Sequence, residues 1–145
     1  MNDKFTIFLQ NLSPLIGTPL LPEKGRLCRL NINHSFDIQI QWEENKNRLL
    51  FGSFFAEIPP GKFRENALKS ALKYNALYPR LGNLSYTKKG NLLLFFTYLY
   101  GLDPEKAGNL LAALIEEITT WKTALDTGNL PYAKEEKMSP FGIKP

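Results

Sequence analysis

The sequence predicts an α+β fold, an antiparallel five-stranded sheet with three helices in the order α-β-β-β-α-β-β-α. Apolar residues recur at spacings of three and four in three segments, and at a spacing of two in five others. The chain has 145 residues, 43% of them hydrophobic, which suffices for one core without disulfides or metal. We expect residues 1–128 to form a single domain and residues 129–145, which lack periodicity, to be a disordered tail.

The first predicted helix covers residues 3–16. Asp3 suits its N-cap, whereas Pro14 makes its last turn doubtful because proline removes a backbone donor. Its apolar stripe comprises Phe5, Phe8, Leu9, Leu12 and Ile16.

Two alternating strands follow this helix, and each has one apolar and one polar face. Short turns are expected at residues 33–35 and 44–47. The apolar positions are Cys28, Leu30 and Ile32 in the first strand and Phe36, Ile38, Ile40 and Trp42 in the second.

Two longer strands, at residues 48–58 and 92–100, are apolar on both faces, and a short strand at residues 84–87 precedes the later one. A strand with two apolar faces must be covered on both sides. The second cover could be the first helix, a second copy of the chain or a bound partner. In the first of these strands Leu49, Phe51 and Phe55 point one way and Leu50, Phe54 and Ile58 the other.

The remaining helices are expected at residues 62–77 and from Pro104 to Gly128. Asp103 suits the N-cap of the last helix, Pro104 its first position and Gly128 its end. A long apolar stripe in this helix includes Leu111, Leu114 and Trp121.

Residues able to carry catalysis or bind metal are scarce. The only histidine, His34, falls in a predicted turn, and the only cysteine, Cys28, falls on the apolar side of a strand. The acidic pairs Glu43-Glu44 and Glu116-Glu117 do not converge. We therefore expect no enzyme activity, no metal, no cofactor and no small-molecule substrate.

The net charge of +4 is unevenly distributed. Residues 61–90 hold seven lysines and arginines against one glutamate, whereas residues 103–126 hold two basic against five acidic residues. The basic helix lacks aromatic residues on the same side, which disfavours nucleic-acid binding. Neither a signal peptide nor a membrane span is evident, so the cytoplasm is expected.

The order and spacing of these elements over residues 3–126 resemble the Tir-chaperone-like family of bacterial type III secretion chaperones. The segments that carry the resemblance are Leu27–Ile32, Leu49–Phe54, Ala71–Leu77, Asn91–Phe95 and Leu110–Leu114, followed by Trp121.

The resemblance implies a non-enzymatic, virulence-associated homodimer that binds an extended N-terminal segment of a secreted effector and keeps it competent for secretion. Such chaperones are typically acidic, and this chain is basic, which suggests an acidic effector segment or another partner. The alternative is a protein-binding adaptor of the same fold within a secretion apparatus.

Two sets of residues are predicted to make these contacts. The first helix and the exposed sheet face should grip the partner through apolar side chains. The predicted partner-binding residues are Phe5, Ile7, Phe8, Leu12, Phe51, Phe55 and Phe95. By the resemblance, the predicted dimer interface comprises Phe63, Ala67, Ala71, Tyr74, Leu92, Leu94 and Phe96.

Overall fold

The computed structural model describes residues 3–24, 26–77 and 79–131. Three helices, five strands and one 3-10 turn occur in these ranges, in the predicted order. They are α1 (Lys4–Ile16), β1 (Leu27–Ile32), β2 (Phe36–Glu43), η1 (Glu44–Lys46), β3 (Arg48–Glu57), α2 (Lys62–Asn75), β4 (Asn83–Thr87), β5 (Leu92–Tyr100) and α3 (Pro104–Thr127). The predicted tail falls mostly on residues 132–145, which lie outside the described residues.

All five strands form one antiparallel sheet in the order β1-β2-β3-β5-β4. The first three strands form a meander because short turns join them. The chain then passes through α2 and returns as the β4–β5 hairpin, with β5 paired to β3. The predicted fold class is therefore confirmed, and the two strands with two apolar faces lie side by side inside the sheet.

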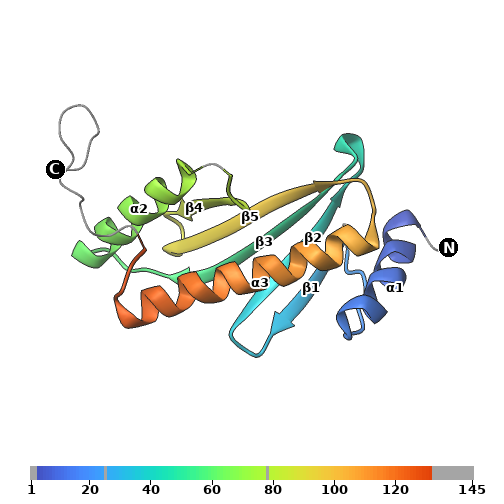
Figure 1. The fold of residues 1–145 in the computed structure, drawn as a ribbon, viewed down its shortest axis with the longest axis horizontal. Coiled ribbons are helices and arrows are strands. Elements are labelled where there is room, and N and C mark those ends of the chain that lie inside the picture. The colour runs from blue at the N-terminus through green and yellow to red at the C-terminus, as the bar shows by residue number, and fades with distance from the viewer. Residues whose placement is uncertain (1–2, 25, 78, 132–145) are drawn as a thin grey trace.

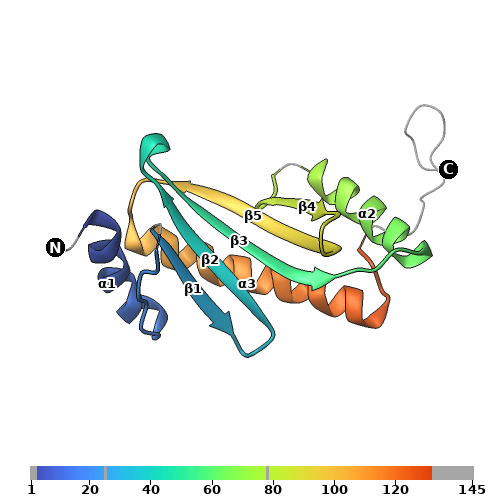
Figure 2. The same ribbon diagram turned by 180° about the vertical axis from the view of Figure 1, so that it is seen from behind.

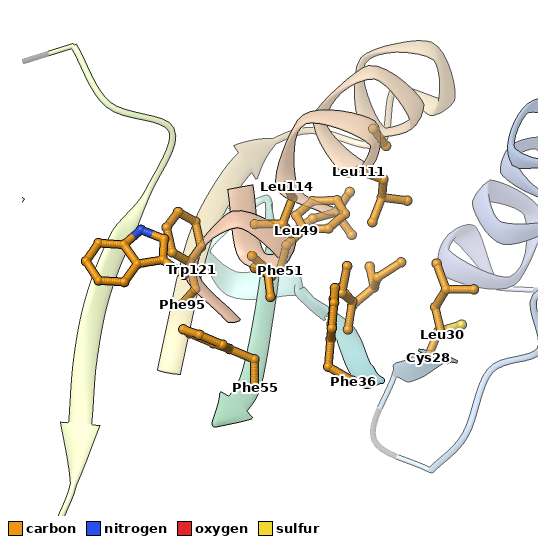
Figure 3. Close-up of a cluster of buried hydrophobic side chains, with 14 of the residues drawn as sticks. Cys28, Leu30, Phe36, Leu49, Phe51, Phe55, Phe95, Leu111, Leu114 and Trp121 are labelled. Carbon is orange, nitrogen blue, oxygen red and sulfur yellow. The ribbon is translucent and has the colours of Figure 1, made fainter. Parts of the chain in front are cut away.

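Helix α3 lies across one face of this sheet, which we call the covered face (Figure 1). Seen from behind, the strands lie in front of α3, and we call this side the open face (Figure 2). Figure 3 shows Phe51, Phe55 and Phe95 of the strands gathered with Leu114 and Trp121 of α3. These five side chains are almost completely buried, so the covered face is the core of the molecule.

Helix α1 begins at the predicted cap, where the Asp3 carboxylate accepts a 2.7 Å hydrogen bond from the Thr6 N–H. The helix continues through Pro14 to Ile16, because Gly17 adopts a left-handed conformation and its N–H bonds to the Ser13 carbonyl. Its buried residues face α3 rather than the open face. Of the three covers considered for the second sheet face, the first helix is therefore not the one.

Helix α2 packs beside β4 at the other end of the molecule (Figure 2). The Asn75 carboxamide makes two 2.8 Å hydrogen bonds to the backbone of Leu84, one to its carbonyl and one from its N–H. The Tyr74 ring lies 5.8 Å from that of Phe95 and 5.7 Å from that of Trp121, centroid to centroid. These contacts join α2 to both the sheet and α3.

Candidate partner-binding surface

The open face carries apolar side chains that no helix of the described chain covers. They come from the second phase of β3 and β5, the positions between those that face α3. Phe54 is 47% exposed and Tyr98 37% exposed, whereas Phe51 and Phe95, on the covered phase of the same strands, are fully buried. A single pair of strands thus supplies both the core and an exposed apolar surface.

A groove of about 380 Å³ lies on this face, and we refer to it below as the groove. Its volume falls in the lower part of the range of roughly 300–1,000 Å³ typical of ligand sites. None of its lining residues is charged. They are Gln39 and Gln41 from β2, Leu50, Gly52 and Phe54 from β3, and Leu94, Phe96 and Tyr98 from β5.

The two banks of the groove differ in chemistry. Strands β3 and β5 provide an apolar floor, whereas β2 provides the carboxamides of Gln39 and Gln41. Within the described ranges, neither carboxamide hydrogen-bonds to another part of the chain. The groove therefore offers apolar area along one side and free hydrogen-bonding groups along the other.

One end of the groove is closed by an aromatic and charged cluster. The Arg48 guanidinium lies 3.9 Å from the centroid of the Tyr98 ring, and its Nε donates a 2.9 Å hydrogen bond to Glu43. This hydrogen bond raises the pKa of Arg48. Lys46 lies 3.9 Å from the same carboxylate, so this cluster of two cations and one anion is net positive. None of its three charged residues lines the groove.

The predicted partner-binding residues lie mainly in the core. Phe51, Phe55 and Phe95 face α3, and Phe5, Phe8 and Leu12 are buried on the inner side of α1. Only Ile7, which is 47% exposed, lies at the surface. The alternation within each strand identified the two-faced strands, but taken strand by strand it assigned the wrong phase to the open side.

The predicted dimer residues are divided between two places. Ala67, Ala71 and Tyr74 are buried on the inner side of α2, whereas Phe63 near the start of the same helix remains 41% exposed. Leu92, Leu94 and Phe96 are partly exposed on β5, and the last two line the groove. Two exposed residues were not included in the prediction: Leu72 on the outer side of α2, at 69%, and Leu77 just after the helix, at 38%.

A second hollow of about 400 Å³ lies where the end of α1 meets β1 and α3. Leu15, Leu30 and Leu111 are among its lining residues, together with Asn31 and Asn33. It lies outside the open face and is more polar than the groove, so the groove is the better candidate for an apolar partner.

The described residues provide no catalytic or metal-binding group. No set of three or more histidine, cysteine, aspartate or glutamate side chains gathers there. His34 is exposed in the turn between β1 and β2. Burial, and to a lesser degree the charge of Glu23, raises the pKa of the Cys28 thiol, which keeps it protonated and unreactive. Within the same ranges, no helix is both long and apolar enough to span a bilayer.

One family model matches most of the chain. The model of the Tir chaperone protein (CesT) family matches residues 8–122. No curated protein matches the sequence. Similar solved structures include the HopA1–SchA chaperone–effector complex, with 19% identity, a TM-score of 0.60, and coverage of 83% of this chain and 94% of that chain.

Two further structures share the fold at lower identity. The Yersinia pestis type III secretion chaperone SycH, in complex with a fragment of YscM2, has 13% identity, a TM-score of 0.62, and coverage of 81% of this chain and 98% of that chain. The ExsC–ExsE complex has 16% identity, a TM-score of 0.62, and coverage of 88% and 94%.

Proposed function

Because the chain belongs to the Tir chaperone protein (CesT) family and is a non-enzymatic type III secretion chaperone, we propose that it holds a secreted effector through the groove on its open face. The bound part is an extended segment near the effector's N-terminus. The complex forms in the bacterial cytoplasm and keeps this segment from folding or aggregating before secretion. The observation that supports the proposal is the uncovered apolar floor made by β3 and β5.

Apolar contact supplies the affinity in this proposal. Fully burying one large apolar side chain contributes on the order of 1.5–3 kcal/mol, so a few anchors offset the cost of ordering the segment. The groove has no charged lining residue, and binding should therefore persist at high salt.

We further propose that the chaperone acts as a homodimer through the outer side of α2. Leu72 on this side is 69% exposed, and Leu77, just after the end of the helix, is 38% exposed. Light scattering at micromolar concentration should give twice the 16.5 kDa chain mass. Leu72→Asp should halve that mass, and a wild-type monomer would contradict the proposal.

The test of effector binding uses a secreted-protein fragment that co-purifies with the chain, titrated at low and high salt. Phe54→Asp should abolish binding because it places a charge in the groove. Leu21→Asp is the matched control, since Leu21 is 78% exposed and lies outside the groove.

Two results would redirect the proposal. If Ile7→Asp weakens binding and Phe54→Asp does not, the segment lies on the first helix, as the sequence predicted. If binding collapses with salt while both variants are silent, the partner is held by the basic region at residues 61–90.

A further inference from the structure

The floor of the groove lacks one side chain, at Gly52. This residue lies in the middle of β3, between Leu50 and Phe54 on the open phase. It is opposite Gln39 on β2 and opposite Phe96 on β5. Four side chains therefore surround a position that has none.

The spacing of these neighbours matches one large side chain. Leu50 and Phe54 each start roughly 6.5 Å from Gly52 along the strand, and residues opposite each other on neighbouring strands have Cβ atoms about 5 Å apart. Between packed helices, a space enclosed by four side chains accepts one side chain from the facing helix. The space at Gly52 is enclosed in the same way. Here the enclosure opens away from the core.

Neither the backbone nor the packing of the chain requires glycine here. Gly52 is not among the residues with a positive φ, so other residues can adopt its conformation. A Cβ added to it would lie 3.6 Å from Leu94 Cδ1 and 3.7 Å from both the Phe95 carbonyl oxygen and Phe96 Cβ. These are ordinary van der Waals distances, and glycine inside a strand costs stability. Such a glycine marks a place where another molecule comes close.

We propose that Gly52 forms a socket for one large aliphatic side chain of the effector segment, an inference that rests on the proposed function above. The inserted group must be uncharged, since no lining residue would neutralise it. The carboxamides of Gln39 and Gln41 stand beside the socket and suit backbone N–H and C=O groups. An extended segment offers such groups, whereas a helix uses them internally.

A second copy of the chain fits this site less well. A stable dimer buries about 800 Å² on each partner and engages some 20 to 30 residues a side. Eight residues line the groove, so an interface of dimer size would have to extend well beyond it. Its size and its carboxamide bank fit a short extended segment.

The first experiment fills the socket. Gly52→Val should fold with unchanged or higher stability in urea and should bind the co-purified effector segment about 10- to 150-fold more weakly, the loss expected for one buried aliphatic side chain. Gly52→Ala should show a smaller loss of affinity. If the valine variant is unstable, the affinity of Gly52→Ala is used instead to test the socket. Ser85→Val places the same side chain on the open face of β4, outside the groove, and should bind normally.

The second experiment locates the inserted side chain. Alanine scanning of the segment should find one aliphatic position whose truncation weakens wild-type binding and has little further effect on Gly52→Val. Gly52→Cys adds an accessible thiol in a chain whose own cysteine is buried. A maleimide should label it in the free protein and not in the complex.

The outcomes separate the two proposals. If the wild type binds the segment and folded Gly52→Val binds it equally tightly, the socket is wrong and the chaperone function stands. Loss of the dimer in Gly52→Val, seen by light scattering, would assign the groove to a second copy and overturn the socket. If the wild type does not bind the segment, both proposals fail.

Discussion

The covered and open faces of the sheet are made by the same two strands and have opposite uses. On the covered face, Leu49, Phe51 and Phe95 are fully buried under α3, whereas Phe54 and Tyr98, on the alternate positions of the same strands, remain exposed. Because successive side chains of a strand point to opposite sides, a shift of one residue separates folding from binding. Substitutions on the two phases should therefore affect different measurements.

The largest expected contrast is between two phenylalanines of β3. Phe51→Ala should cost about 3–5 kcal/mol of unfolding free energy because it leaves a cavity under α3. Phe54→Ala should cost less than about 1 kcal/mol and should weaken effector binding. Urea unfolding followed by circular dichroism gives both values, and equal costs would show that the open face is part of the core.

Two glycines offer a second contrast. A Cβ at Gly82 would overlap the Phe96 carbonyl oxygen and lie 2.8 Å from the Phe95 ring, so Gly82→Ala should destabilise the chain by about 1–3 kcal/mol. Gly52→Ala should instead be neutral or add up to about 1 kcal/mol. Chemical denaturation of the two variants side by side tests this. A destabilised Gly52→Ala would mean that its glycine serves the fold.

A smaller effect of opposite sign is expected at Ser53, on the covered phase of β3. Its hydroxyl is fully buried and has no hydrogen-bond partner among the described residues. Ser53→Ala should therefore raise the unfolding free energy by about 1 kcal/mol. Ser85→Ala, at an exposed position of β4, is the control and should leave stability unchanged. A loss of stability in Ser53→Ala would show that its hydroxyl is satisfied.

The smallest expected effect is the loss of N-terminal capping of α1 at acidic pH. The buried residues of this helix support α3 on the covered side. The Thr6 N–H lowers the pKa of the Asp3 carboxyl. The cap therefore contributes fully above the unfolded pKa of about 3.9 and loses its contribution as pH falls through the lower folded value. Hydrogen exchange of the first turn should quicken in that range. Asp3→Asn should lack this pH dependence while still capping the helix.

The assignment of the open phase could have been made from the sequence. Strands β2 and β3 are joined by a short turn closed by Glu43 opposite Arg48, and counting back places Leu50 opposite Gln41 and Gly52 opposite Gln39. The polar phase of β2 already marked that side as the one without a core. The register of β2 and β3 therefore places Leu50, Gly52 and Phe54 on the open side.

Other features depend on packing that no local pattern reports. Helices α1 and α3 both have apolar stripes, and either could have lain on the sheet. The longer α3 reaches across the strands, whereas α1 packs against its end. Exposure of Leu72 likewise follows from how α2 is seated beside β4.

The position of α3 after all five strands has a consequence for synthesis of the protein. While the ribosome is adding α3, the strands β1 to β3 that precede it have no helix to cover them, with Phe51 on one side and Phe54 on the other. The nascent strands therefore expose two apolar surfaces at once, a state that favours aggregation. Completion of one helix removes the larger of them. The chaperone thus passes, as it is made, through the same hazard from which it is proposed to protect its effector.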